Sequence, residues 1–208
     1  MTDAASSPDI LGRGRVLPVV TITALQHAVP VAQALLDGGI TTAEVVLRTP
    51  VALAAIEAIR RDVPGLRLGA GTVLSAADLA NARAAGAEFA ISPGLTPALL
   101  AAARDSGLPF LPAVASASEL MLGLEYGYTD FKLFPASVLG TATARALQGP
   151  FPQARFCATG GITRENAGNF LAVGNIRMVG LSWLTPADAV AAGDWERIRA
   201  LSREAAAL

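Results

Sequence analysis

The sequence predicts an α/β fold, a single-domain (β/α)8 TIM barrel, and three observations lead to this prediction. Short apolar runs rich in Val, Ile and Phe alternate with Ala- and Leu-rich helical patterns, which is typical of repeated βα units around a parallel sheet. Hydrophobic residues make up 52% of the chain and charged residues only 16%, as expected of strands buried on both faces. The strand pattern occurs eight times, the number that closes such a barrel.

Each expected strand ends in a loop that would lie at the carboxyl edge of the barrel, where the active site of this fold is built. The first strand is followed by a helical pattern that stops at Gly38 and Gly39, because glycine suits the turn past a helix end. The predicted strands are Val16–Ile22, Thr42–Leu47, Leu66–Thr72, Phe89–Ser92, Phe110–Ala115, Asp130–Phe134, Arg155–Thr159 and Ile176–Leu181.

The helices expected between these strands often begin after Ser or Thr, whose side chains cap free backbone amides. An open doubly wound sheet is the alternative fold, but it needs a glycine fingerprint after the first strand, and Pro18–Ala24 contains none. The predicted helices are Gln26–Leu36, Ala76–Ala85, Pro97–Asp105, Ser118–Tyr126, Arg164–Ala172 and a closing helix over Trp195–Ala207.

Length and charge limit the organisation and the partners of the protein. A chain of 208 residues suits one domain of roughly 100 to 200 residues, so we expect one barrel over residues 1–208 with a lead-in segment at 1–14. The net charge of −1 without a run of like charges excludes nucleic acid and anionic membranes as expected partners. The polar start and the single cysteine predict a cytoplasmic protein, and no apolar run reaches the roughly 18 residues that span a bilayer.

Lys132 is the only lysine of the chain, and it lies within an apolar predicted strand end. Burial disfavours the charged form of a lysine and so supplies the free amine that attacks a carbonyl group. The alternative is a lysine that extends to the barrel rim without chemistry.

Glu44 and Arg48 alternate with Val45 and Leu47 in the second predicted strand, so the two charged side chains would face the barrel interior. Isolated charges are costly there and require a partner or a ligand. A structural ion pair is the alternative to a functional role.

Small residues end several predicted strands and leave room for a ligand. Thr72 follows a Gly-Ala-Gly run and offers a hydroxyl to a carboxylate, while Thr159-Gly160-Gly161 and Ser182 end the last two strands. Barrels often bind phosphate at those two loops, although glycines also serve tight packing and ordinary turns.

His27 and Cys157, the only residues of their kinds, are interpreted as structural. They provide no zinc site, no Ser-His-Asp arrangement and no Cys-His arrangement. No acidic cluster at a strand end indicates magnesium, so neither a metal nor another cofactor is expected.

Five segments in this order resemble the KDPG/KHG aldolase family, and the resemblance runs from about Val16 to the last helix. The family cleaves 2-keto-3-deoxy-6-phosphogluconate (KDPG) or 4-hydroxy-2-oxoglutarate (KHG). The segments are Glu44-Val45-Val46-Leu47-Arg48-Thr49, Gly69-Ala70-Gly71-Thr72-Val73-Leu74, Ile91-Ser92-Pro93-Gly94-Leu95-Thr96, Phe131-Lys132-Leu133-Phe134-Pro135-Ala136 and Phe156-Cys157-Ala158-Thr159-Gly160-Gly161-Ile162.

The resemblance implies a metal-free class I aldolase of the Entner-Doudoroff pathway, a lyase that releases pyruvate through a Schiff base and forms a homotrimer. It implies that Lys132 forms the imine and that Glu44 transfers protons. The remaining roles that it implies are carboxylate binding by Arg48 and Thr72, a pyruvyl pocket lined by Pro93 and Phe134, contact of Thr159 with the substrate hydroxyls, and phosphate binding by Gly160, Gly161 and Ser182.

Three positions depart from the family pattern: Ala158 replaces a proline, Leu181 replaces a glycine, and Ser137 replaces a glutamate. Leu181 bears on phosphate binding, because its side chain either narrows the amide nest or turns outward into the helix layer. Three other activities stay open. They are aldol cleavage of 4-hydroxy-2-oxoglutarate, cleavage of the galactonate epimer, and a phosphosugar isomerase or synthase that forms no imine. A barrel that only binds a small acid or assembles with partners, without turnover, is the non-enzymatic alternative.

Overall fold

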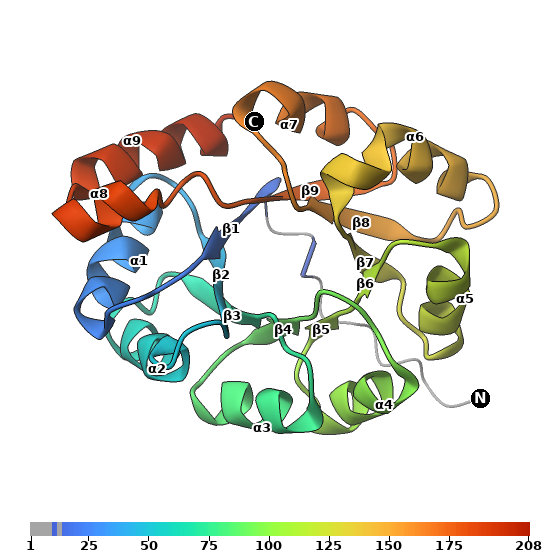
Figure 1. Ribbon diagram of the computed structural model, residues 1–208, viewed down its shortest axis with the longest axis horizontal. Coiled ribbons are helices and arrows are strands. Elements are labelled where there is room, and N and C mark those ends of the chain that lie inside the picture. Colours follow the sequence, from blue (N-terminus) through green and yellow to red (C-terminus); the bar gives the residue numbers. More distant parts are fainter. Residues whose placement is uncertain (1–9, 12–13) are drawn as a thin grey trace.

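Parallel strands form an inner ring and helices form an outer layer in the computed structural model, which describes residues 10–11 and 14–208 (Figure 1). Every paired strand runs parallel to its neighbours. The predicted α/β barrel is therefore confirmed. Its strands are β1 (Val16–Val20), β2 (Thr42–Val46), β3 (Arg67–Gly71), β4 (Phe89–Ile91), β5 (Phe110–Leu111), β6 (Ala113–Val114), β7 (Asp130–Leu133), β8 (Arg155–Thr159) and β9 (Ile176–Leu181).

The predicted fifth strand is divided into β5 and β6 by Pro112. The sheet order is β5-β4-β3-β2-β1-β9-β8-β7-β6, so the sheet begins and ends on the two halves of one chain segment. Proline has no backbone N–H to donate to a neighbouring strand, but the Pro112 carbonyl accepts a hydrogen bond from the Lys132 N–H at 2.8 Å. The ring therefore closes through this break, and the prediction of one continuous strand was wrong.

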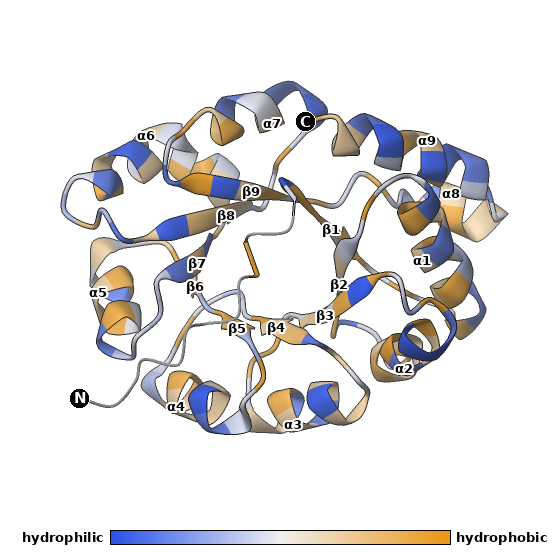
Figure 2. Ribbon diagram, turned by 180° about the vertical axis from the view of Figure 1, so that it is seen from behind, coloured by the Kyte–Doolittle hydropathy of each residue, from blue (hydrophilic) through white to orange (hydrophobic). Residues whose placement is uncertain are grey.

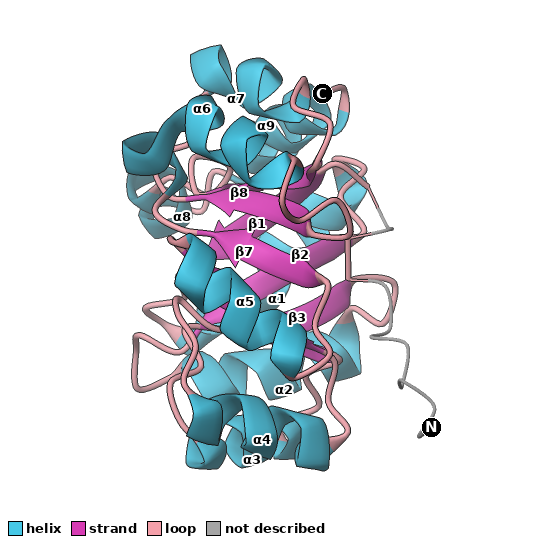
Figure 3. Cartoon of the chain, turned by 90° about the vertical axis from the view of Figure 1, so that its right-hand side faces the viewer, coloured by secondary structure: helices cyan, strands magenta, loops and turns pink. Residues whose placement is uncertain are grey.

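Helices cover the outside of the ring on all sides, as the side view also shows (Figure 3). The serine and threonine caps are confirmed at Ser75, Thr96 and Ser116, each of which accepts a backbone N–H from the first helical turn. The helices are η1 (Leu25–His27), α1 (Ala28–Asp37), α2 (Ala52–Asp62), α3 (Ala76–Ala84), α4 (Pro97–Ser106), α5 (Ala117–Glu125), α6 (Ala136–Gln148), α7 (Arg164–Leu171), α8 (Ala187–Ala192) and α9 (Trp195–Ala206).

Two hydrophobic clusters hold the layers together. The larger one fills the space between the strands and the helices, and the colouring by hydropathy shows mostly hydrophobic strands beside helices of mixed character (Figure 2). The smaller one lies inside the ring. Ile10 and Leu11 belong to it, so part of the predicted lead-in packs into the barrel, while residues 1–9 and 12–13 of that segment lie outside the described residues. The other members are Leu17, Phe89, Ile91, Leu111, Cys157 and Met178.

Candidate active site

Lys132 and Glu44 meet inside the barrel, although they come from strands that are not neighbours. Lys132 Nζ lies 3.6 Å from Glu44 Oε1, and the two side chains are only 6% and 0% exposed. Glu44 faces inward because it pairs with Gly69, which pairs in turn with the interior residue Phe89. Lys132 faces inward because it pairs with Cys157 of the same interior cluster. The structure thus brings the two predicted catalytic side chains together.

The Glu44 carboxylate has unused capacity to accept hydrogen bonds. Both of its oxygens are buried and find no hydrogen-bond donor among the described residues. A buried carboxylate is costly in this state, so a ligand hydroxyl or a water molecule is its expected partner. Gly71 makes room for it, because a Cβ atom at that position would overlap the Glu44 carboxylate.

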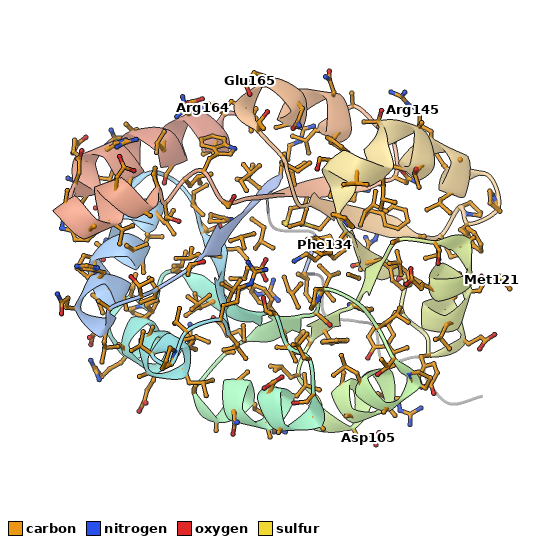
Figure 4. All side chains as sticks on the ribbon, viewed as in Figure 1. Asp105, Met121, Phe134, Arg145, Arg164 and Glu165 are labelled. Atoms are coloured by element: carbon orange, nitrogen blue, oxygen red, sulfur yellow. The ribbon has the colours of Figure 1, made fainter. Side chains whose placement is uncertain are left out.

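The Lys132 amine lies between a carboxylate and an aromatic ring inside the barrel. The carboxylate is that of Glu44. Lys132 Nζ also lies 5.3 Å from the centre of the Phe134 ring, and Phe134 points into the ring while Met121 and Arg145 lie at the periphery (Figure 4). The amine and the carboxylate therefore lie side by side in the barrel interior, next to an aromatic ring.

Arg48 and Thr72 lie together at the carboxyl ends of β2 and β3. Arg48 Nε donates a hydrogen bond of 3.1 Å to Thr72 Oγ1, and Arg48 is exposed to the barrel mouth. The φ angle of Thr72 is 61°, an unfavourable value for a β-branched residue and one that is associated with functional sites. Pro93, which is partly buried, follows β4 close by in the ring.

The loop after β8 has the backbone expected of an anion site. Gly160 and Gly161 have φ angles of 96° and 71°, which favour glycine, and consecutive amides in turns of this kind form anion-binding nests. A Cβ atom on Gly161 would overlap the Ser137 hydroxyl. The serine that departs from the family pattern therefore lies directly against this loop.

Leu181 turns away from the barrel mouth. It is fully buried in the cluster between strands and helices and pairs with Pro18 of β1. Of the two orientations considered for it, the outward one is observed. Ala158 is buried in the same cluster, so neither departure enters the site, and Ser182 stays exposed at the end of β9.

A cavity of about 240 Å³ adjoins Ser182 between the ends of β1 and β9. Thr21, Thr23, His27 and Thr185 also line it. These four residues were not assigned to the site from the sequence. The usable signal was the hydroxyl side chain at Thr21 and again at Thr23, just past the first strand, where a strand-like alternation places both on the face of Val19.

The Cys157 thiol is buried beside the catalytic pair, and its Sγ lies 3.5 Å from Thr159 Oγ1. Burial raises the pKa of this thiol to about 12, although the Thr159 contact and Lys132 act in the opposite direction. In the unfolded chain a thiol titrates near roughly 8.5. At a pH between these two pKa values, the Cys157 thiol is deprotonated in the unfolded chain but still protonated in the folded protein.

The free energy of unfolding is therefore expected to fall as pH rises above about 8.5, by up to roughly 1.4 kcal/mol per pH unit from this thiol alone. Cys157→Ala should show a shallower fall when urea unfolding is measured between roughly pH 8 and pH 10. Tyr128, whose pKa burial raises to about 12, contributes above roughly pH 10, where a free tyrosine titrates. Equal slopes for the two proteins would contradict the assignment.

Within residues 10–11 and 14–208, no group of three or more His, Cys, Asp or Glu side chains is arranged to hold a metal ion. None of the helices in the same part of the chain is both long enough and apolar enough to cross a bilayer.

Comparison with known proteins places this site in a family. The family model described as "KDPG and KHG aldolase" matches residues 8–201. The chain is 50% identical over 203 residues to "2-dehydro-3-deoxy-phosphogluconate aldolase" of Pseudoalteromonas atlantica, covering 97% of this chain and 94% of that protein. It is 50% identical over 201 residues to "KHG/KDPG aldolase" of Escherichia coli, covering 96% of this chain and 94% of that protein.

Solved structures of KDPG aldolases are similar to this chain in fold and in sequence. KDPG aldolase from Legionella pneumophila, with pyruvate captured as a covalent carbinolamine, has a TM-score of 0.92 and 44% identity over 94% of this chain and 96% of that one. The Zymomonas mobilis ZM4 enzyme with 3-phosphoglycerate has a TM-score of 0.89 and 43% identity over 100% of this chain and 96% of that one.

Proposed function

The chain belongs to the KDPG and KHG aldolase family, and from that membership we propose that it cleaves 2-dehydro-3-deoxy-6-phosphogluconate to pyruvate and glyceraldehyde 3-phosphate through a Schiff base on Lys132. The protein is a carbon–carbon lyase, as its named relatives are. The observation that carries the proposed mechanism is the buried amine of Lys132 at 3.6 Å from the unsatisfied carboxylate of Glu44.

The first half of the reaction forms the imine. The Lys132 amine adds to the C2 ketone of the substrate to give a carbinolamine, which loses water, with Glu44 supplying and accepting the protons. The same intermediate type is named in the Legionella structure, where pyruvate is captured as a covalent carbinolamine. This supports the assignment of the nucleophile to the single lysine of the present chain.

The second half breaks the bond between C3 and C4. Glu44 takes the proton of the C4 hydroxyl, the electrons of the bond move into the protonated imine, and the aldehyde departs. The enamine that remains on Lys132 is protonated at C3 and hydrolysed, which releases pyruvate and restores the amine. The imine thus serves as the electron sink.

The other site residues bind the two ends of the substrate. The Arg48 fork suits a carboxylate, and Thr72 adds a hydroxyl from the neighbouring strand. Pro93 and Phe134 line the pyruvyl pocket. At the far end Thr159 contacts the substrate hydroxyls, and the backbone of Gly160 and Gly161 with the Ser182 hydroxyl holds the phosphate.

The test of this function is a comparison of kcat/KM for three acids: the phosphorylated gluconate derivative, its galactonate epimer and 4-hydroxy-2-oxoglutarate. The phosphorylated gluconate derivative is expected to be cleaved most efficiently. The five-carbon acid is the second candidate, since the E. coli relative is named for both activities. A strong preference for the unphosphorylated acid would overturn the choice of substrate, and cleavage of none of them would favour an isomerase or synthase.

The pathway, the assembly and the location are proposed from the same family membership. The enzyme would act in the Entner-Doudoroff pathway in the cytoplasm, and it would assemble as a homotrimer. Leu74 and Val138 support a subunit contact, because these apolar side chains are 63% and 80% exposed in the single chain. Leu74 follows β3, and Val138 lies near the start of α6.

A further inference from the structure

The cavity beside Ser182 is lined by hydroxyl and imidazole groups together with apolar side chains. Thr21, Thr23, Ser182 and Thr185 bring hydroxyl groups, and His27 brings an imidazole whose Nδ1 is buried without a hydrogen-bond partner among the described residues. Val19 and residues of α8 complete the wall. An apolar occupant would leave these groups unsatisfied at a cost, so the lining favours a ligand that carries several hydroxyl or phosphate oxygens.

Strand register places the β1 wall of this cavity next to Glu44. Val19 of β1 pairs with Glu44 of β2, and paired residues of parallel strands share a face. Thr21 lies two residues further toward the carboxyl end and faces the same way. On the other side, Gly180 of β9 pairs with the interior residue Leu17, which puts Ser182, two residues on, at the level of Val19.

The direction in which the substrate extends across the barrel mouth follows from the strands that carry the proposed carboxylate and pyruvyl contacts. The proposed carboxylate and pyruvyl contacts, Arg48, Thr72, Pro93 and Phe134, come from the ends of β2, β3, β4 and β7. The strands without such a contact are β5 and β6, which lie between β4 and β7, and the continuous arc of β8, β9 and β1. The proposed phosphate contacts Gly160, Gly161 and Ser182 follow β8 and β9, so the fragment beyond C3 extends into that arc, where the cavity lies.

We propose that Thr21 and Thr23, which line this cavity together with Ser182, are specificity-determining residues that favour long phosphorylated acids over short dicarboxylates. The inference rests on the proposed function, because it extends the same site from Ser182 to β1. The departing fragment of 4-hydroxy-2-oxoglutarate has two carbons and no phosphate, so it does not reach β1.

The test uses the double variant Thr21→Val/Thr23→Val, which keeps the side-chain shape and removes both hydroxyls. Both threonines are exposed, so the fold is expected to survive. Two lost hydrogen bonds of about 0.5–1.5 kcal/mol each predict a loss of roughly 5- to 150-fold in kcat/KM for the phosphorylated six-carbon acid. Inhibition by glyceraldehyde 3-phosphate should weaken in proportion, while kcat/KM for 4-hydroxy-2-oxoglutarate changes less than about twofold.

Thr129→Val is the matched control, because Thr129 is also exposed but precedes β7 at the amino end of the barrel. This variant should have the same kcat/KM as the unchanged protein for both acids. Equal losses on the two acids, or no loss on either, would overturn the inference while leaving the proposed function intact. If the unchanged protein cleaves neither acid, the proposed function itself fails.

Discussion

Lys132→Arg is expected to abolish aldol cleavage, with a fall in kcat on the order of 10⁴-fold or more, the scale seen when a catalytic nucleophile is removed. Arginine keeps a positive charge beside Glu44, so the buried pair is not left as a lone carboxylate. It cannot become a free amine near neutral pH, and without an amine no imine forms. The loss should therefore appear in kcat, and the variant should remain folded.

The number of lysines makes the covalent test unusually sharp. Because Lys132 is the only lysine, treatment with pyruvate and borohydride should add one reduced pyruvyl group. Peptide mass mapping should locate this group on Lys132 and distinguish it from a group on the N-terminal amine. Lys132→Arg should give no such peptide. The double variant Lys132→Arg/Arg177→Lys restores one lysine at an exposed position of β9 and should also give none. A pyruvyl group trapped elsewhere, or substantial turnover by Lys132→Arg, would refute the mechanism.

The strand pattern was sufficient to predict the fold because buried parallel strands need continuous apolar runs. The interruption at Pro112 was overlooked because the flanking Phe110 and Val114 are strong strand formers, although a proline inside a strand run is itself a signal of an interruption. The strand pattern could not show that Ile10 and Leu11 pack inside the ring. That contact joins residues far apart in the sequence, and such pairing leaves no local periodic signal.

The sequence predicted the part of the candidate site around Glu44 and Arg48 better than the part around Ser182. Alternation in the second strand directed Glu44 and Arg48 inward, and the structure places both side chains in the barrel, Glu44 against Lys132 and Arg48 against Thr72. The orientation of Leu181 needed the register of β9 with β1. The hydroxyls of Thr21 and Thr23 were overlooked because threonine is common both in strands and in ordinary loops.

Glu44→Gln is expected to lower kcat by about 10²-fold or more, the usual contribution of a positioned acid or base. The amide has nearly the same shape as the carboxyl group, so the close approach of Gly71 to this side chain is retained. It cannot accept the proton of the C4 hydroxyl. Trapping of pyruvate on Lys132 should still occur, but more slowly, because the amine remains and only its proton carrier is lost.

Single-turnover kinetics separates these two effects by following adduct formation and bond cleavage in the same variant. Glu125→Gln is the matched control, since Glu125 is an exposed residue at the end of α5 and should have no effect on either step. The assignment predicts that both steps slow in Glu44→Gln, because one carboxylate serves each of them. A normal cleavage rate would mean that another group carries the proton, and slowing of imine formation alone would restrict Glu44 to the first half of the reaction.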